Sequence, residues 1–328
     1  MKVLVTGGAG YIGSVTTREL VNRGYEVVVF DDLSYGHRQV IPKEAKFIKG
    51  DLLDRSAIFS ALSKEKIEAV VHFAGFIAVG ESVKEPLKYI KDNILGGYNL
   101  LDAMKELKTN KIIFSSSAAV YGDPDSIPIK ENDKLSPTSP YGETKLIFEK
   151  FLSWCDTAYG LKSICLRYFN AAGADNENDL GEDHNPETHL IPLVLKVALG
   201  KREKIDVFGT DYETPDGTCV RDYVHVKDLA AAHVIALEHL EKGGASSFYN
   251  VGSSKGYSVK ELIDVCRKIT GKNIKVVESP RRAGDPPKLV ASSEKIKKDL
   301  GFAFRHSGLE EIISDAWKWH LKHPDGYK

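Results

Sequence analysis

The chain has 328 residues, which is enough for a well-buried core and lies in the size range where one core commonly gives way to two. Its 45 lysines and arginines balance 46 aspartates and glutamates to a formal net charge of -1, which excludes the basic field that binds nucleic acid or an anionic membrane. The apolar runs are only strand-length and no signal-type segment precedes the first of them, so we expect a soluble cytoplasmic protein with no membrane partner.

The four cysteines favour a reducing compartment. They form neither a CxxC pair nor a dense framework: Cys155, Cys165, Cys219 and Cys266. We therefore interpret them as small buried hydrophobic residues rather than disulfide partners or metal ligands.

The first half of the chain alternates short β-branched runs with helical patterns. The runs predict strands at 2–6, 26–30, 46–49, 69–73, 111–115 and 162–167. Alternation of this kind implies a parallel sheet with helices on both faces, and nearly all-apolar runs fit strands that are buried on both sides. The predicted fold class is therefore α/β, with a doubly wound parallel sheet.

The composition changes after about residue 171. The stretch 171–192 is rich in Gly, Asn, Asp, Pro and Glu, which predicts a loop before a helix that opens near its end. We place the domain boundary here, with a first domain over 1–170 and a smaller α/β substrate-binding domain over 171–328.

A later helix complicates this division. The pattern over 226–240, with Asp228 as its candidate cap, has one apolar face that can pack on the first domain. We therefore expect partly interleaved domains, with 220–245 returning to the first.

A glycine-rich turn directly follows the first predicted strand. The spacing is G-x-x-G-x-x-G, and it leads into a helical pattern: Gly7, Gly10, Tyr11, Ile12 and Gly13. Glycines permit a tight turn and close backbone approach, and the helix N-terminus offers free N–H groups to a pyrophosphate. A plain strand-to-helix turn is the alternative, whereas the absence of Gly-Lys-Ser/Thr removes the mononucleotide P-loop. The motif favours a Rossmann-type dinucleotide site.

Acidic residues at the end of the second strand favour NAD as the cofactor. Asp31 and Asp32 stand where a carboxylate can accept both ribose hydroxyls of the adenosine and repel a 2′-phosphate. A simple capping role is the alternative. Further candidates for cofactor contacts follow the third and fourth strands, at the edge where ligands bind such sheets: Asp51, Leu52, Phe73 and Ala74.

Two Tyr-x-x-x-Lys pairs occur, and their local patterns distinguish them. Tyr223 and Lys227 lie in a stretch that alternates with period two, which predicts a strand that holds them about 13 Å apart. Tyr141 opens a helical pattern after Pro140, and Lys145 then lies one turn later on the same face. Only the second pair can act as a unit.

This pair predicts a general base. The Lys145 ammonium and the positive nicotinamide ring both stabilise phenolate, so we expect the pKa of Tyr141 to fall from about 10 toward the working pH. Ser115 ends the fifth strand and Ser117 follows it, where Ser117 is placed to bridge a substrate hydroxyl and Tyr141. Helix capping or turn chemistry is the alternative for this serine run.

Together the glycine turn, Ser117 and the Tyr141–Lys145 pair resemble the extended short-chain dehydrogenase/reductase family. Four further stretches resemble its UDP-galactose 4-epimerases: 167–170, 216–226, 281–285 and 323–327. The match covers essentially the whole chain. The resemblance implies C4 epimerisation of UDP-sugars through a 4-keto intermediate, by transient hydride transfer to tightly bound NAD.

The resemblance also implies roles for individual residues. Three lie against the cofactor: Asn93, Ser115 and Tyr168. Arg221 and Arg282 hold the UDP phosphates, which suits the planar guanidinium. The other implied substrate contacts are Asn170, Leu190, Phe208 and Asp285, the last of them to the uridine ribose. Arg281 is interpreted as an ordinary surface arginine.

Three positions depart from the family pattern. Ile77 stands where many members carry a lysine near the cofactor phosphates, which weakens one contact. His189 replaces a frequent asparagine and Leu289 an aromatic or small residue of the sugar pocket, so sugar specificity stays open. Asp183, His184 and His189 suggest a metal, but their spacing fits no known ligand set, and we predict no metal site.

Two other functions fit the sequence less well. A nucleotide-sugar 4,6-dehydratase needs an acidic pair just after the catalytic hydroxyl, where this chain has Ala118 and Ala119. An NAD-sensing scaffold needs no catalytic residues, so the presence of Ser117, Tyr141 and Lys145 together argues against it.

We also expect a homodimer. The helix after Tyr141 is apolar around much of its surface, more than one sheet-facing side requires, and would pair with the helix over 93–107.

Overall fold

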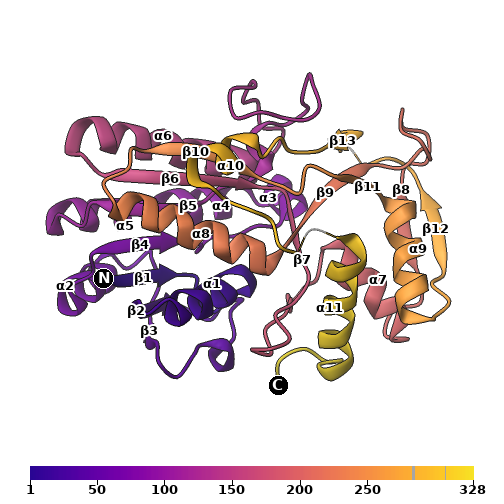
Figure 1. Cartoon of the computed structure of the whole chain (residues 1–328), viewed down its shortest axis with the longest axis horizontal. Helices are drawn as coiled ribbons and strands as arrows, with labels where there is room; N and C mark the ends of the chain where they lie inside the picture. The colour runs from indigo at the N-terminus through magenta and orange to yellow at the C-terminus, as the bar shows by residue number, and fades with distance from the viewer. Residues whose placement is uncertain (283–284, 307) are drawn as a thin grey trace.

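A large parallel sheet organises the molecule. The computed structural model describes residues 1–282, 285–306 and 308–328 (Figure 1). Within them, a seven-stranded sheet has the order β10-β6-β5-β4-β1-β2-β3, and all neighbouring strands are parallel. Its strands are β1 (Lys2–Thr6), β2 (Glu26–Asp31), β3 (Lys46–Lys49), β4 (Ala69–His72), β5 (Lys111–Ser115), β6 (Lys162–Tyr168) and β10 (Ser247–Val251). The predicted α/β fold and its first six strands are confirmed.

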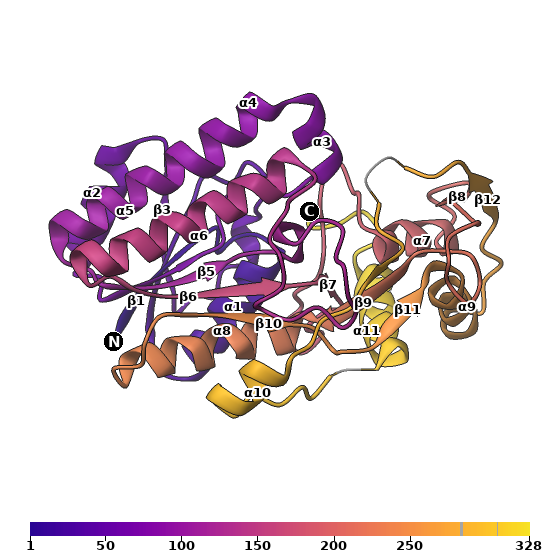
Figure 2. The ribbon, with the colours of Figure 1, turned by 90° about the horizontal axis from the view of Figure 1, so that it is seen from above.

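The strands are apolar because both faces of the sheet are covered. On β1, Val3 and Val5 pack into the cluster on one face, and Leu4 packs into the cluster on the other. The helices that cover the first face are α1 (Tyr11–Asn22), α8 (Val226–Glu241) and α10 (Glu294–Leu300), and those on the second are α2 (Arg55–Glu65), α5 (Gly96–Leu107) and α6 (Pro140–Tyr159) (Figure 2).

The strand order places the candidate site. The chain moves from β1 outward to β2 and β3, and then crosses to β4 on the other side of β1. In such sheets ligands bind outside the carboxyl ends of the strands, at the point where the order reverses. The turns that follow β1, β2, β4 and β5 all lie at this edge, so residues far apart in sequence meet there.

Two later segments return to the large sheet. Helix α8 packs against α1, and β10 pairs with β6 at the sheet edge. The candidate cap Asp228 is wrong, because the strand ends at His225 and the helix begins at Val226. His225 Nδ1 accepts from Lys227 N (3.1 Å), and the Asp228 carboxylate instead accepts from the backbone N–H groups of Arg305 and His306.

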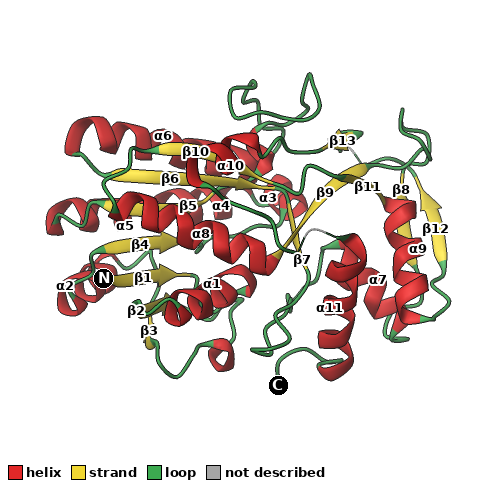
Figure 3. Cartoon of the chain, in the orientation of Figure 1, coloured by secondary structure: helices red, strands yellow, loops and turns green. Residues whose placement is uncertain are grey.

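The rest of the chain builds a smaller body beside the sheet (Figure 3). One apolar cluster joins three helices and two strands: α7 (Leu190–Ala198), α9 (Val259–Thr270), α11 (Leu309–Lys322), β8 (Ile205–Phe208) and β12 (Val276–Ser279). A second small sheet connects the two bodies and consists of β7 (Asn170–Ala172), β9 (Val220–His225), β11 (Gly256–Ser258) and β13 (Lys288–Leu289).

Short helices complete the chain. They are the 3-10 helices η1 (Arg38–Val40) and η3 (Ala118–Val120), the helices α3 (Val79–Lys84) and α4 (Pro86–Tyr89), and the π-helix η2 (Ile90–Leu95). The helix expected over 93–107 is therefore divided between η2 and α5. Among the described helices, none combines the length and the apolar character that crossing a bilayer requires.

Candidate active site

The glycine turn is built for close approach. Gly7 has φ +72°, and a Cβ there would lie 2.6 Å from the backbone N of Ala74. A Cβ on Gly13 would lie 2.1 Å from the carbonyl oxygen of Gly7. Helix α1 begins at Tyr11 without a side-chain cap and without an acidic residue in its first turn. Its first N–H groups, those of Tyr11 and Ile12 included, therefore suit an anion such as a pyrophosphate.

Asp31 connects this turn to the end of β2. Its Oδ2 accepts from Ala9 N (3.0 Å) and its Oδ1 from Leu33 N (2.9 Å). Burial raises its pKa above the ordinary value, against the effect of these two hydrogen bonds. Asp32 is exposed and accepts from the backbone and hydroxyl of Ser34. Asp32 thus fits the capping alternative, whereas Asp31 is the carboxylate held against the glycine turn.

The turn after β4 is held beside the same glycines. The backbone N–H groups of Phe73 and Ala74 donate to Thr6 O, at 2.9 and 3.1 Å. Asn93 lies on η2, where its Oδ1 accepts from Phe76 N (2.8 Å) and its Nδ2 donates to Thr144 Oγ1 (3.1 Å). Asn93 therefore ties the turn after β4 to α6.

The other cofactor candidates lie around this edge. Asp51 Oδ1 accepts from Leu53 N (2.8 Å), and Leu52 is buried beneath Gly96 of α5. Ile77 is 41% exposed. Its side chain has no polar group to replace the family's lysine.

Tyr141 and Lys145 are placed by the start of α6. The Ser139 hydroxyl caps this helix by accepting from Gly142 N (3.2 Å), and Pro140 occupies its first position. Lys145 Nζ lies 5.7 Å from the centre of the Tyr141 ring and donates to Ser115 O (2.8 Å). The Ser115 hydroxyl in turn shares a 2.6 Å hydrogen bond with the hydroxyl of Tyr168. The predicted pair is therefore assembled, and Ser115 joins it to Tyr168.

Burial raises the pKa of Tyr141 above its ordinary value, and the Ser117 hydroxyl opposes this only in part. In the protein without cofactor, desolvation therefore penalises phenolate more than Ser117 stabilises it. The predicted fall includes the charge of the nicotinamide ring, so it concerns the cofactor-bound protein and stays a prediction. Burial also lowers the pKa of Lys145 to about 8, against the opposing effect of Glu149.

Ser117 serves both of the roles considered for it. It is the N-cap of η3, where its hydroxyl accepts from Ala119 N (3.1 Å). The same hydroxyl is near enough to the Tyr141 phenol to lower its pKa. Capping therefore holds the hydroxyl near the phenol rather than competing with that role.

The substrate candidates gather around Asp285. Its Oδ2 accepts from Arg282 Nε (2.9 Å), and its Oδ1 lies 3.9 Å from Arg221 Nη2. The Arg282 guanidinium lies 4.8 Å from the ring centre of Phe208. Arg221 also donates to the carbonyl oxygen of Pro286 (2.9 Å). Two guanidinium groups, a carboxylate and an aromatic ring thus lie together, a set that suits a nucleoside diphosphate.

The remaining candidates make other contacts. Asn170 donates to Asp222 O (2.9 Å), and Leu190 is the first residue of α7. Arg281 donates to Asp211 Oδ1 (2.7 Å), as expected of an ordinary arginine. Gly284 of the same motif lies outside the described residues. The second Tyr-x-x-x-Lys pair is not on one strand, because β9 ends at His225 and Lys227 belongs to α8.

One buried ion pair beneath the site was not predicted. Arg167 Nη2 lies 2.6 Å from Glu149 Oε2, and both side chains are almost fully buried. Ser116 donates to Glu149 Oε1 (2.5 Å), and Arg167 Nη1 donates to the Tyr121 hydroxyl (3.0 Å). The network thereby holds Ser116, the middle residue of the serine run, by its hydroxyl. The sequence did contain a signal for this pair. Glu149 lies one turn after Lys145 on the buried face of α6, and a buried carboxylate requires a partner of opposite charge.

Asp222 organises the joint between the two bodies. Burial raises its pKa to about 6, although it accepts hydrogen bonds from the backbone N–H groups of Ser253, Ser254 and Ala291. Three chain segments are therefore held at one carboxylate beside Arg221.

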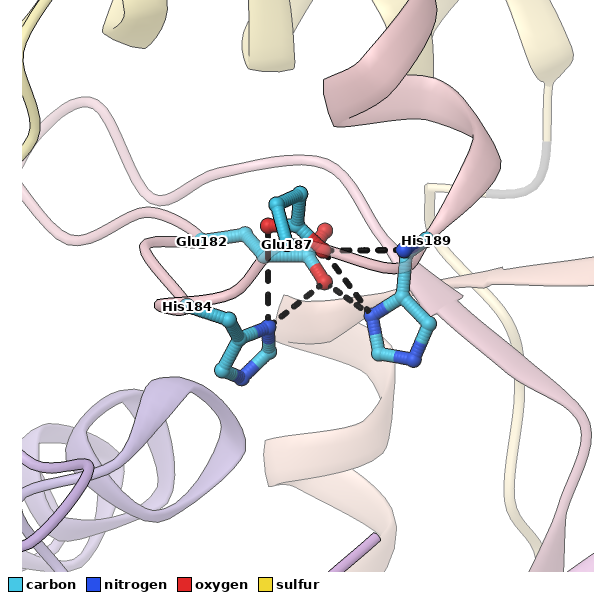
Figure 4. Close-up of side chains that lie close together, drawn as sticks. All are labelled: Glu182, His184, Glu187 and His189. Atoms are coloured by element: carbon cyan, nitrogen blue, oxygen red, sulfur yellow. Dashed lines mark hydrogen bonds and ion pairs between the residues drawn. The ribbon is translucent and has the colours of Figure 1, made fainter. Parts of the chain in front are cut away.

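A cluster of histidines and glutamates lies in the loop before α7 (Figure 4). One ligand-capable atom from each of four side chains lies within 4.8 Å of the others: Glu182, His184, Glu187 and His189. Burial opposes ionisation, yet His189 and His184 hold the pKa of Glu182 at about 2. Asp183, weighed with the histidines from the sequence, points elsewhere and accepts from Tyr327 N (2.9 Å). The sequence analysis missed the two glutamates because spacing alone does not show how a loop folds.

Comparisons with known proteins identify the family of this chain. The model of the NAD dependent epimerase/dehydratase family matches residues 3–252. A UDP-glucose 4-epimerase of Halalkalibacterium halodurans is 52% identical, over 100% of this chain and 98% of that protein. A crystal structure of UDP-glucose 4-epimerase, 51% identical, has a TM-score of 0.97 over 100% of both chains.

A second solved structure carries ligands. It is the Bifidobacterium longum UDP-glucose 4-epimerase in complex with NAD+ and UDP, 39% identical, with a TM-score of 0.95 over 100% of both chains. The family match spans most of the chain and the relatives span all of it, so this chain belongs to the NAD dependent epimerase/dehydratase family.

Proposed function

We propose that this protein interconverts UDP-glucose and UDP-galactose by epimerisation at C4, with tightly bound NAD. The observation that carries the proposal is the trio of Ser117, Tyr141 and Lys145, assembled at the sheet edge beside the glycine turn. The names of the relatives support it, as does the bound NAD+ and UDP of the Bifidobacterium longum enzyme.

The residues present fit NAD. The glycine turn and the start of α1 suit the pyrophosphate, and Asp31 suits the adenosine ribose. Asn93, Ser115 and Tyr168 would line the cofactor side of the site. NAD, when bound, supplies a reversible hydride acceptor at the sugar carbon and a positive charge near Tyr141.

The chain's own residues would move the proton. Tyr141 takes the proton of the sugar C4 hydroxyl as the C4 hydride leaves, so a 4-keto sugar forms. Ser117 keeps that hydroxyl in line with the phenol. After the keto sugar turns over, Tyr141 would return the proton to the C4 oxygen, and the hydride would be supplied by the bound cofactor to the opposite face of C4. No external oxidant is consumed.

The proposed nucleotide contacts lie on β9 of the connecting sheet and on the segment before β13. Arg221 and Arg282 would bind the diphosphate, and Asp285 the uridine ribose. We also propose an NAD-binding domain over 1–170 and a nucleotide-sugar-binding domain over 171–328, with 220–245 returning to the first, as β10 and α10 also do. Asn170, Leu190 and Phe208 would complete the sugar nucleotide contacts.

The dehydratase alternative lacks its acid. Ala118 and Ala119 follow Ser117 on η3, and Ala118 is buried, so no carboxylate stands at either position to eliminate water. Elimination is therefore disfavoured.

A single NMR experiment tests the proposal. Purified protein is offered UDP-galactose, UDP-N-acetylgalactosamine and UDP-glucuronate in separate tubes, each with and without added NAD. We expect UDP-galactose to convert to UDP-glucose. An unchanged spectrum with NAD present would overturn the proposal, and a 4-keto-6-deoxy product would favour the dehydratase.

Leu289 governs the expected breadth toward N-acetylated sugars. It lies on β13 opposite Arg221 of β9 and packs beside the cluster that contains Ala118 and Leu146. Leucine leaves more room than tyrosine, so we expect weak but measurable epimerisation of the N-acetyl pair. Leu289→Tyr should lower that activity selectively, by a factor of roughly 10 to 200, the usual effect of bulk in a pocket.

Rates with the two sugar classes, measured side by side, check this prediction. Leu135→Phe is the control, because Leu135 packs against the same cluster and is not a proposed sugar contact. Equal losses for both sugars in Leu289→Tyr would show that this residue does not line the acetyl side of the pocket.

We further propose a homodimer through η2, α5 and α6. Large apolar side chains are exposed on these helices and on the neighbouring α4: Leu87, Ile90, Leu95, Tyr98 and Trp154. Several of them line one shallow depression together with Phe151 of α6. Exposed apolar residues that gather in this way are typical of a protein–protein interface. Burying it between two copies of the chain explains its composition.

Light scattering at micromolar concentration should give twice the mass of the chain. Leu95→Glu combined with Trp154→Lys should shift the mass to that of one chain, because charges would enter the interface. Tyr35→Lys is the control, an exposed aromatic that lies outside this depression. A wild-type monomer would exclude the dimer.

A cytoplasmic location is also proposed, supported by the free state of all four cysteines.

A further inference from the structure

We propose that Glu182, His184, Glu187 and His189 form a binding site for one divalent ion of the Zn²⁺ class. The site lies in the loop between β7 and α7, and its four side chains point toward one another (Figure 4). The inference replaces the sequence-based prediction of no metal.

The separations from His184 are close to those of a tetrahedral site. His184 Nδ1 lies 3.4 Å from Glu182 Oε1 and 3.7 Å from Glu187 Oε2, and one ligand-capable atom of each of the four residues lies within 4.8 Å of the others. Bonds of about 2.0–2.2 Å to a tetrahedral zinc place neighbouring ligands about 3.3–3.6 Å apart. His189 Nδ1 also contacts Glu182 Oε1 directly, and an entering ion would replace this contact.

The carboxylates are buried and one is oriented. The Glu182 and Glu187 side chains are 5% and 2% exposed. Glu187 Oε1 accepts from the backbone N–H groups of Thr188 (2.7 Å) and His189 (2.9 Å), which directs the second oxygen toward His184. Orientation of this kind is typical of metal-binding carboxylates. The His189 side chain is 44% exposed and provides a path from solvent.

No hydrogen bond of normal length joins His184 Nδ1 to either carboxylate. Both separations from His184 Nδ1 are longer than a normal N–H···O hydrogen bond. One divalent cation would neutralise both buried carboxylates and use both imidazoles as neutral ligands. Imidazole with carboxylate suits zinc and its neighbours, whereas calcium and magnesium prefer oxygen ligands alone.

The position indicates a structural ion. The His184 ring lies edge-on to the ring of Tyr11, with 6.3 Å between their centres, and the Tyr11 hydroxyl donates to Gly173 O (2.7 Å). His189 is the N-cap residue of α7. A bound ion would therefore connect the start of α1, beside the glycine turn, to the start of α7.

The C-terminal segment holds the same loop from its other side. His323 Nε2 lies 2.7 Å from Asp179 Oδ1, and the Tyr327 hydroxyl accepts from Gly181 N (2.8 Å). These contacts fix the loop directly before Glu182. The ligands are therefore presented by a supported segment rather than by a free loop.

Metal content and thermal unfolding test the proposal. Protein stripped with a chelator and dialysed is titrated with Zn²⁺, and the ions bound per chain are counted by elemental analysis. We expect one ion per chain and a higher unfolding midpoint, because the ion binds only the folded state. His184→Gln with His189→Gln should weaken Zn²⁺ binding by at least about tenfold. His306→Gln is the matched control, since His306 pairs with Glu311 at the surface (2.7 Å).

X-ray absorption of the zinc-loaded wild-type protein gives an answer even if the double variant folds poorly. We expect a shell of two imidazoles with oxygen ligands. Sulfur ligation would place the ion at a cysteine instead and overturn the site. Substoichiometric binding, or an equal loss in His306→Gln, would overturn it as well.

Discussion

Replacing Tyr141 with phenylalanine is expected to lower the turnover of UDP-galactose by about 10²-fold or more while NAD stays bound. The ring packs as before, because the side chain is 7% exposed and keeps its shape. Only the hydroxyl that accepts the substrate proton is lost. Turnover by NMR and NAD released on denaturation give the two readouts.

The second Tyr-x-x-x-Lys pair provides the matched control. Tyr223 is as buried as Tyr141, but it lies on β9, and its partner Lys227 lies on α8. Tyr223→Phe should keep near-normal turnover. If Tyr141→Phe also keeps near-normal turnover, or if both variants lose the same amount, Tyr141 is not the base.

Removing the Glu149 carboxylate is expected to destabilise the fold by about 3–5 kcal/mol, the usual result of breaking a buried pair. Glu149→Leu would leave the Arg167 guanidinium in the core without its counter-charge, and Ser116 without its acceptor. The free energy of unfolding from urea titration measures the effect.

Two further variants separate the buried charge from general damage. Glu149→Leu combined with Arg167→Met removes both charges and should recover part of the loss, because apolar replacements of buried pairs are often tolerated. Glu203→Gln breaks an exposed pair with Lys275 and should change stability by less than about 1 kcal/mol. A Glu149→Leu effect as small as that of Glu203→Gln would contradict the role given to this network.

The raised pKa of Tyr141 has a consequence for catalysis. In the protein without cofactor, burial raises the pKa of this phenol above its ordinary value. A positive charge next to the phenol favours phenolate. Proton transfer is therefore expected to depend on cofactor occupancy, and the Lys145 ammonium at the ring adds to that charge.

The sequence by itself determined the parts whose cause is local. Strand-length apolar runs, the glycine turn before α1 and the Ser139–Pro140 start of α6 depend on neighbouring residues, so their patterns predicted the sheet and the Tyr141–Lys145 pair. The motif resemblance added roles for Arg221, Arg282 and Asp285, which the structure brings together.

Only the tertiary structure decided what depends on contacts between distant segments. Asp228 accepts hydrogen bonds from Arg305 and His306 instead of capping its own helix. Arg167 of β6 forms an ion pair with Glu149 of α6. Burial raises the pKa of Tyr141 in the protein without cofactor, because desolvation reflects everything packed around the phenol. The loop from Glu182 to His189 brings four ligand-capable side chains together, since its path is set by packing against α1, α7 and the C-terminal segment rather than by residue spacing.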